Sequence, residues 1–301
     1  ELVPYLRKKY GPENVVAMGH NTKPTDKMAK EGPYDFVDVS NKNEFMEKAK
    51  KHKVDTIYHL SSILSAGAEK NPQLAWDVNM IGTYNCLEIG RELSLERVII
   101  PSSIAAFGPE TPRENTPNET ILRPTTMYGL TKVASELLGN YYYKKFNLDV
   151  RGLRYPGIIG SEAPPGPGTT EYAIHIFYEA IKNKKYTCFL KEDTYLPMMY
   201  MPDALKAITD LAEAPVSKLK HHSDFNVNSI SFSPKELALE IKKHIPEFKI
   251  DYKPDFRQAI ADSWPKSLDD SAARKEWGWK PKHDIKTMTK DMIEKLAPRL
   301  L

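Results

Sequence analysis

The sequence predicts an α/β fold built on a doubly wound, Rossmann-type parallel sheet. Two observations carry this prediction. Short runs rich in β-branched residues alternate with longer stretches whose apolar residues recur at three- and four-residue spacing. The order strand, helix, strand repeats through the first half of the chain, and this order places helices on both faces of a parallel sheet.

The elements follow in order along the chain. A helix at residues 1–10 opens the sequence and ends at Gly11-Pro12. The predicted strands cover residues 14–18, 35–39, 54–60, 97–101 and 150–155. The clearest helices cover residues 43–52, 73–93 and 126–146.

The second half of the chain differs from the first in composition and in the order of its elements. Residues 160–168 are rich in proline and glycine. The elements predicted after them are helices at about 171–183 and 203–213, a strand at 225–228, a helix opened by Ser233-Pro234 and a last helix at 285–296. We therefore expect residues 156–186 and 216–301 to form a smaller α/β lobe that receives a substrate. Residues 1–155 would form the dinucleotide-binding domain, to which residues of about 187–215 return.

The first strand and the glycine-rich turn of a dinucleotide-binding fold are not found in the printed chain. In dinucleotide-binding folds the first strand leads into a glycine-rich turn, whose N–H groups and following helix hold the pyrophosphate. The printed chain starts in a helix and contains no G-x-G-x-x-G. We expect the first strand and this turn to lie upstream of the printed sequence. The alternative is a chain that does not hold a dinucleotide in the usual way.

Composition argues against several function classes. The chain has 43 basic and 40 acidic residues, a net charge of +3, which gives no electrostatic footprint for nucleic acid. No apolar run approaches the ~20 residues of a membrane-spanning helix. Cys86 and Cys188 stand far apart, and the eight histidines show no metal-binding spacing. We therefore expect no nucleic-acid partner, no membrane partner and no metal.

The chemistry is concentrated at Tyr128 and Lys132. These residues stand four apart, so they share one face of the helix at 126–146. The same spacing recurs elsewhere on ordinary amphipathic helices, but only Tyr128 follows a strand that ends in Ser102-Ser103. Ligands of open α/β sheets bind at the carboxyl ends of the strands. A serine hydroxyl, a phenol and an ammonium are therefore predicted to meet there.

Such a cluster suits metal-free oxidation of an alcohol. Tyr128 would be the general base, Lys132 its electrostatic partner and Ser103 the anchor of the substrate hydroxyl, with Ser102 as the alternative anchor. A free phenol titrates near pH 10, and an ammonium ~4–5 Å away supplies about 3–4 kcal/mol toward the phenolate. We therefore expect the pKa of Tyr128 to be lowered. The other reading is a surface Tyr–Lys pair beside a capping serine.

From residue 14 to the C-terminus the chain resembles the extended short-chain dehydrogenases, a superfamily that includes the nucleotide-sugar epimerases. The matching segments are residues 54–61, 77–83, 102–108 and 154–160. The resemblance implies NAD as the cofactor; the residues Met18-Gly19-His20-Asn21 do not themselves distinguish NAD from NADP. The cofactor-binding residues that it implies are Asp38, Val39, His59, Leu60, Ser61, Asn79, Lys132, Tyr155, Pro156 and Ile158.

Within that superfamily the details resemble the L-threonine 3-dehydrogenases. The segments that carry this finer resemblance are residues 61–72, 165–173, 196–201, 260–265 and 277–279. It implies NAD-dependent oxidation of the L-threonine side-chain hydroxyl to 2-amino-3-oxobutyrate. The substrate-binding residues implied are Ser65, Ser102, Tyr128, Thr169 and Thr170; the alternative for Ser65 and both threonines is that they cap turns or helices.

Two other functions stay open: a nucleotide-sugar epimerase or dehydratase with tightly bound NAD, and a non-catalytic dinucleotide sensor. Pro197 stands where many sugar-nucleotide enzymes carry an arginine, which favours the threonine reading. Similar enzymes pair through two long helices, so we expect a homodimer through helices 73–93 and 126–146. By the same resemblance the compartment would be the mitochondrial matrix in a eukaryote and the cytoplasm in a bacterium.

Overall fold

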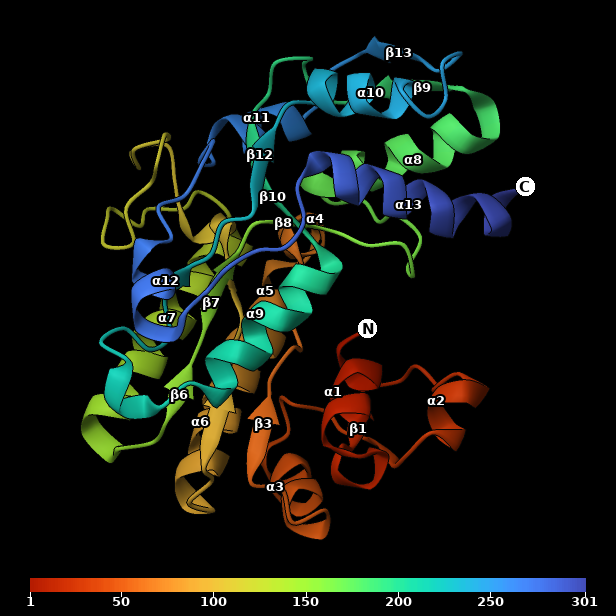
Figure 1. Ribbon diagram of the computed structural model, residues 1–301. Helices are drawn as coiled ribbons and strands as arrows, with labels where there is room; N and C mark the ends of the chain where they lie inside the picture. Colours follow the sequence, from red (N-terminus) through yellow and green to blue (C-terminus); the bar gives the residue numbers. More distant parts are fainter.

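The computed structural model describes residues 1–301 and opens in helix α1 (Leu2–Tyr10), as predicted (Figure 1). Strand β1 (Ala17–Gly19) pairs in parallel with β2 (Tyr34–Phe36). Between and after them lie helices α2 (Asp26–Lys30) and α3 (Lys42–Lys51). In α3 the side chain of Asn41 caps the helix by accepting a hydrogen bond from the backbone N–H of Glu44.

The main sheet is parallel throughout. Strands β3 (Thr56–Tyr58), β4 (Arg97–Ile99) and β6 (Val150–Arg151) pair side by side. Strands β5 (Ser102–Ser103), β7 (Leu153–Tyr155) and β11 (Phe225–Asn226) pair in the same way. Since β5 follows β4 after two residues and β7 follows β6 after one, the six pieces form one layer, running from β3 at one side to β11 at the other.

Helices cover both faces of this layer. Val98, Ile100 and Val150 pack with α3, α6 (Gly82–Glu92) and α7 (Met127–Phe146) in one buried cluster. Ile99 and Leu153 pack with α9 (Met201–Glu213) in another. Consecutive strand residues point to opposite faces, so this division is the signature of a sheet buried on both sides. The predicted doubly wound α/β fold is confirmed.

The long helix predicted at 73–93 is built from three pieces. It begins as α5 (Pro72–Ala75), passes through a π-helical turn at Trp76–Ile81 and continues as α6. A short helix, α4 (Ser65–Lys70), precedes it. π-helical turns occur mostly inside α-helices and often at functional sites.

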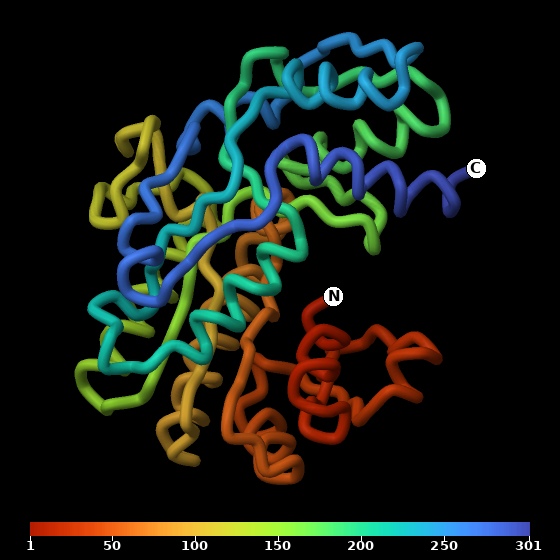
Figure 2. The backbone as a smooth tube through the Cα atoms, viewed as in Figure 1, coloured from red at the N-terminus to blue at the C-terminus, as the bar shows by residue number.

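The C-terminal part has its own small sheets. Much of it gathers at the top of the view in Figure 2, away from the N-terminal helices. Strand β10 (Leu196–Tyr200) lies between β8 (Gly157–Ile159), which is parallel to it, and β12 (Ile230–Phe232), which is antiparallel. Strand β9 (Lys185–Cys188) pairs in parallel with β13 (Lys249–Tyr252). The helices of this part are α8 (Tyr172–Asn183), α10 (Pro234–Lys242), α11 (Arg257–Asp262), α12 (Ser271–Trp277) and α13 (Ile285–Leu300).

The strand pairing divides the segment expected to return to the first domain at about 187–215. Its strand β10 pairs with β8 and β12, and every residue of β10 is buried, so this strand forms the core of the C-terminal sheet. Its helix α9, together with Met199 of β10, packs against the main sheet. Conversely β11, expected in the substrate lobe, completes the main sheet beside β7. The two parts therefore interleave more than the sequence suggested.

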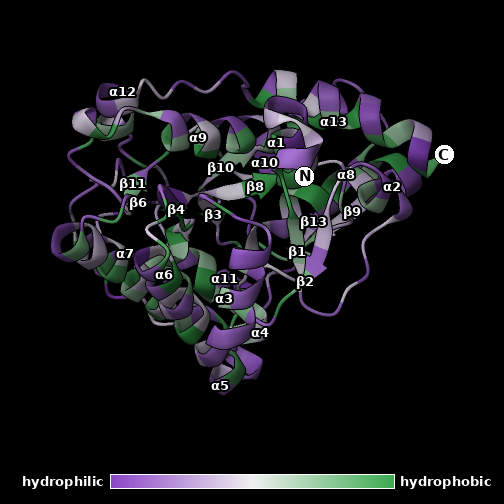
Figure 3. Ribbon diagram, turned by 90° about the horizontal axis from the view of Figure 1, so that it is seen from below, coloured by the Kyte–Doolittle hydropathy of each residue, from purple (hydrophilic) through white to green (hydrophobic).

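The helices carry hydrophilic and hydrophobic residues side by side, as amphipathic helices do (Figure 3). No helix combines the length and the apolar character that a membrane span requires.

Candidate active site

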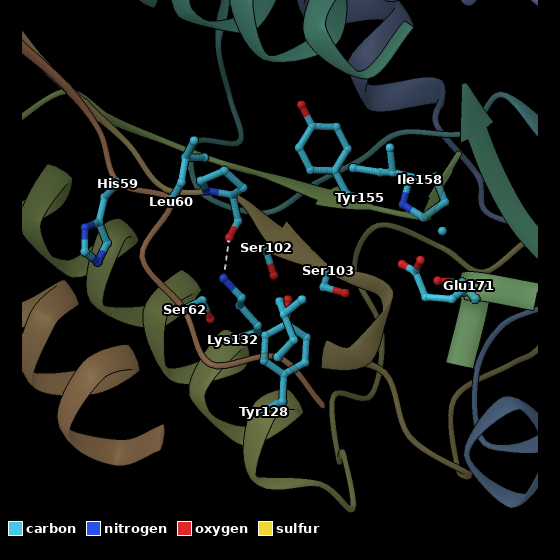
Figure 4. Close-up of a pocket in the computed structure, with 15 residues that line it drawn as sticks. His59, Leu60, Ser62, Ser102, Ser103, Tyr128, Lys132, Tyr155, Ile158 and Glu171 are labelled. Atoms are coloured by element: carbon cyan, nitrogen blue, oxygen red, sulfur yellow. Dashed lines mark hydrogen bonds between the residues drawn. The ribbon is translucent and has the colours of Figure 1, made fainter. Parts of the chain in front are cut away.

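A cavity opens at the carboxyl ends of β3, β5 and β7, where the sequence placed the chemistry (Figure 4). Ten of the predicted site residues line it: His59, Leu60, Ser102, Ser103, Tyr128, Lys132, Tyr155, Pro156, Ile158 and Thr170. Its remaining wall was not predicted and consists of Ser62, Leu64, Pro101, Gly157 and Glu171. Segments far apart in the sequence thus meet in one pocket.

Helix α7 brings Tyr128 and Lys132 to this pocket. The helix starts at this point because the Thr126 hydroxyl accepts a hydrogen bond from the Gly129 N–H at 3.1 Å. Gly129 also permits close contact with the serine segment, since a Cβ there would lie 2.2 Å from the carbonyl oxygen of Ala105. The Lys132 Nζ lies 5.5 Å from the centre of the Tyr128 ring. The predicted pair therefore shares one helix face beside β5.

The pKa of Tyr128 does not shift in the expected direction. Desolvation raises the pKa of Tyr128 to about 12, and the hydrogen bond with Ser103 only partly offsets this. The reason is the direction of the lysine: the Lys132 ammonium donates to the carbonyl oxygen of Pro101 at 2.8 Å rather than to the phenol. Desolvation also lowers the pKa of Lys132 to about 8. The expected lowering of the Tyr128 pKa is wrong for this state of the protein.

The two consecutive serines have different surroundings. Ser102 donates its hydroxyl proton to the carboxylate of Glu136, away from Tyr128. Ser103 accepts a hydrogen bond from the Ala105 N–H at 3.2 Å and lines the pocket beside Tyr128, whose pKa its hydroxyl lowers. Neighbouring strand residues point to opposite faces, which explains the division. The arrangement favours Ser103 over Ser102 as the anchor of a substrate hydroxyl.

Asn79, which was predicted as a cofactor contact, is not among the residues that line the pocket. Its side-chain oxygen accepts from the Ile63 N–H at 2.7 Å, and its amide nitrogen donates to the Ile63 carbonyl at 3.1 Å. The same nitrogen donates to the Thr131 hydroxyl. Because both ends of the amide are engaged, Asn79 instead fastens the loop after β3 to helix α7.

The other predicted residues are not among those that line the pocket. Ser65 is the buried first residue of α4, and Thr169 is buried beside Thr170. Asp38 accepts hydrogen bonds from the backbone and side chain of Ser40. Neither these residues nor Val39 and Ser61 line the cavity. Val39 packs against α6, where a Cβ on Gly82 would lie 2.8 Å from the Val39 side chain.

Glu171 is a site residue that the sequence reasoning missed. It supplies the only carboxylate of the pocket lining, and it accepts a hydrogen bond from the Gly166 N–H at 2.8 Å. Figure 4 shows it on the other side of Ser103 from Lys132. The pocket therefore carries an acidic side chain and a basic side chain on either side of the serine. The one available signal was its place directly after Thr169-Thr170, in the loop that carries the finer resemblance.

Comparison with known proteins supports the assignment of this site to the nicotinamide-dependent enzymes. The chain belongs to the NAD dependent epimerase/dehydratase family, whose model matches residues 1–227. An uncharacterized epimerase/dehydratase of Staphylococcus haemolyticus is 46% identical over 300 residues, covering 99% of this chain and 94% of the relative.

Solved structures give a finer similarity. L-threonine dehydrogenase from Clostridium difficile is 52% identical with a TM-score of 0.97, covering 99% of this chain and 94% of that one. The enzyme from Phytophthora infestans is 50% identical with a TM-score of 0.95, covering 100% and 95%. A monomeric L-threonine 3-dehydrogenase from a metagenome is 42% identical with a TM-score of 0.95, covering 100% and 96%.

NAD is the cofactor of this family, and the pocket fits it. The His59 Nε2 atom and the Ser62 hydroxyl are buried without a hydrogen-bond partner, so both could bond a polar ligand such as a ribose. Burial lowers the pKa of His59 to about 3, which leaves a neutral imidazole. His59, Lys132 and the segment 155–158 would hold the nicotinamide half, and NAD would supply the hydride acceptor.

Proposed function

We propose that the protein is an NAD-dependent L-threonine 3-dehydrogenase, which oxidises the threonine side-chain hydroxyl to give 2-amino-3-oxobutyrate. The observation that carries this proposal is the meeting of Ser103, Tyr128 and Lys132 with Glu171 in one pocket. The first three residues suit oxidation of an alcohol. The carboxylate suits a substrate that also bears an ammonium group.

The role that we propose for each residue follows from its position in the pocket. Ser103 would hold the substrate hydroxyl, and Tyr128 would take its proton as hydride leaves the carbon for NAD. With its pKa raised to about 12, Tyr128 is protonated at neutral pH in the structure as it stands. Rotation of the Lys132 ammonium from the Pro101 carbonyl toward the phenol would favour the phenolate, since an opposite charge is felt strongly in a desolvated site.

The substrate's polar end would lie toward Glu171 and Thr170. The carboxylate of Glu171 would pair with the threonine ammonium, while it keeps its hydrogen bond from Gly166. The Thr170 hydroxyl would donate to the threonine carboxylate. Ser65 and Thr169 stay predicted contacts that would require movement of the surrounding loops, because both are buried and neither lines the pocket.

The test is NADH absorbance with purified protein, NAD and L-threonine, compared with L-allo-threonine, L-serine and NADP. Formation of NADH only with L-threonine and NAD supports the proposal. Tyr128→Phe serves as the catalytic control, since it removes the base and leaves the ring. No reaction with any of these amino acids, despite NAD binding, would contradict the proposal.

A second candidate is an epimerase or dehydratase that acts on a nucleotide sugar with tightly bound NAD. The description of the family and the names of curated relatives favour it. Protection from thermal unfolding by a UDP-sugar, with no effect of threonine, would select this reading. A non-catalytic dinucleotide sensor would bind NAD and consume neither kind of substrate.

We also propose a homodimer through the helices of residues 73–93 and 126–146. These helices expose large apolar side chains on their outer surface: Leu74, Ile81, Tyr84, Leu130, Leu137 and Tyr141. Equilibrium sedimentation should give twice the 34.3 kDa chain mass, and Leu137→Glu should restore the single mass. A wild-type monomer, as in the similar metagenomic enzyme, would refute the dimer.

The cellular compartment that we propose depends on whether the protein comes from a bacterium or a eukaryote. The similar proteins come from Staphylococcus and Clostridium as well as from Phytophthora. Cytoplasm in a bacterium and mitochondrial matrix in a eukaryote therefore both stay predictions.

A further inference from the structure

Glu136 lies next to the reactive residues without entering the pocket. It stands on α7, one turn beyond Lys132 and two turns beyond Tyr128, and only 3% of it is exposed. Its carboxylate accepts two hydrogen bonds from Arg154, at 2.9 and 2.8 Å, and a third from the Ser102 hydroxyl. One carboxylate thereby joins the catalytic helix to both β5 and β7.

Each of its partners precedes a pocket residue. Ser102 is followed by Ser103, and Arg154 is followed by Tyr155. The parallel pairing of β5 and β7 sets Ser102 opposite Arg154 and Ser103 opposite Tyr155. A displacement of either Glu136 partner along its strand would therefore move a residue of the pocket wall.

Further hydrogen bonds fix the position of Arg154. Its remaining nitrogen donates to the Asn118 carbonyl at 2.7 Å and to the Asn226 side chain at 3.1 Å. Arg154 is 2% exposed. A bidentate, fully buried pair of this kind has a fixed geometry, because a planar guanidinium and a carboxylate fit in only one orientation.

We propose that Glu136 is a positioning residue for the oxidation: its carboxylate holds Ser103 in register with α7, and its negative charge stabilises the ammonium form of Lys132. This inference rests on the proposed dehydrogenase function. Glu136 does not touch the substrate, so its effect passes entirely through its neighbours.

The charges around the Lys132 ammonium support the proposed effect of Glu136 on that ammonium. The titratable groups that line the pocket with Lys132 are His59, Tyr128, Tyr155 and Glu171. The charged groups next to the pocket are Glu136 on α7 and its partner Arg154 on β7. The tyrosines and His59 are neutral, because desolvation raises the pKa of each phenol and lowers that of the imidazole. Desolvation lowers the pKa of Lys132, and Glu136 is the carboxylate that opposes this. Burial raises the pKa of Glu136 in turn, and its ion pair with Arg154 opposes that shift and favours the charged carboxylate.

The experiment measures the titration of Lys132 directly. In cofactor-free protein carrying 13C-labelled lysine, the ε-carbon signal of Lys132 is assigned by its loss in Lys132→Arg and followed from pH 6 to pH 10. Glu136→Gln should lower the midpoint by about one pH unit, the smaller end of the effect of an opposite charge. The same variant should move the alkaline limit of threonine turnover downward by the same amount.

The matched control is Asp149→Asn, which also removes a carboxylate from a bidentate arginine pair, with Arg151, but lies outside the pocket lining. It should leave the Lys132 midpoint unchanged. If Glu136→Gln fails to fold because Arg154 is left without a counter-charge, the double variant Glu136→Gln, Arg154→Gln removes both charges and serves in its place.

An unchanged Lys132 midpoint in a folded Glu136 variant would overturn the proposal. So would an equal fall in Asp149→Asn. If wild-type protein does not oxidise threonine, the proposed function fails, but the NMR titration still decides whether Glu136 supports the charge of Lys132.

Discussion

Two buried arginines three residues apart show how one kind of contact serves two purposes. Arg151 pairs with Asp149 at 2.8 and 2.6 Å and donates to the carbonyls of Leu211 and Ala214 at the end of α9. Arg154 pairs with Glu136, on the helix that carries Tyr128 and Lys132. The first ties a helix terminus to the sheet, and the second ties the sheet to the candidate catalytic helix.

The partners differ in their access to water. The Asp149 side chain is 16% exposed, whereas that of Glu136 is 3% exposed. A carboxylate that reaches solvent can be hydrated when its partner is removed, and a buried one cannot. The comparison teaches that burial alone does not identify a functional ion pair; the elements that the pair connects must be considered.

The largest expected effect is the loss of threonine turnover when the Tyr128 hydroxyl is removed. Tyr128→Phe should reduce threonine turnover by about 10²–10⁴-fold, the usual contribution of a general base. The melting temperature should stay close to wild type, because the ring is kept and only a hydroxyl is lost. Steady-state NADH formation and thermal unfolding measure the two quantities, and near-normal turnover would exclude Tyr128 as the base.

The second prediction separates the two arginines by stability. Arg154→Met should lower the free energy of unfolding by about 3–5 kcal/mol, since Glu136 is left buried without its partner. Arg151→Met should cost less, about 1–3 kcal/mol, because Asp149 can turn to water.

Urea unfolding of the two variants gives both values, and threonine turnover of the folded fraction gives a second contrast. Turnover should fall in Arg154→Met and stay near wild type in Arg151→Met. Equal losses in both quantities would show that the two arginines are equivalent.

A third, smaller effect concerns substrate binding. Glu171→Gln keeps the hydrogen bond from Gly166 but removes the charge, so the KM for threonine should rise about tenfold, with NAD binding unchanged. Glu162→Gln, on the same loop but outside the pocket lining, is the matched control and should leave the KM unchanged. A rise in both variants would indicate a general effect of loop charge.

A fourth prediction concerns the pH dependence of stability. The pKa of Lys132 falls from 10.5 to about 8 on folding, so below pH 8 its ammonium is protonated in both states and its burial costs stability. Between pH 8 and 10.5 the folded state loses the proton first, and that cost declines. Compared with Lys132→Met, wild-type stability should therefore rise over this window by at most about 3 kcal/mol. Urea unfolding at pH 7.5 and pH 10 tests this, and a constant difference would contradict the lowered pKa.

The fold was largely predictable because helix and strand periodicity is local. The helix predicted at 126–146 is observed at Met127–Phe146, and the opening helix at Leu2–Tyr10. The strand predicted at 150–155 is instead divided at Gly152, whose N–H bonds to the carbonyl of His222. That partner lies far along the chain, so the periodicity of the segment contains no sign of the break.

The site was predictable where a motif combined with its place in the fold. Ser103, Tyr128 and Lys132 meet as expected, because strand ends and helix spacing fix their positions. The pair of Glu136 and Arg154 was not foreseen, since nothing local marks two residues on different elements as partners. The shift of the Tyr128 pKa depends on which way one lysine side chain points, and a rotamer leaves no trace in the sequence.

The π-helical turn at Trp76–Ile81 has a consequence for the angular phase of its helix. Each α-helical residue advances the chain by about 100° around the axis, so an added residue rotates everything on one side of the turn relative to the other. Deleting one residue within the turn would restore a continuous α-helix and rotate α5 relative to α6. The Asn79 amide would then no longer face Ile63, and the loop that carries Ser62 would lose its fastening. The π-helical turn thus sets the rotation of α5 relative to α6, and with it the direction in which the Asn79 amide points.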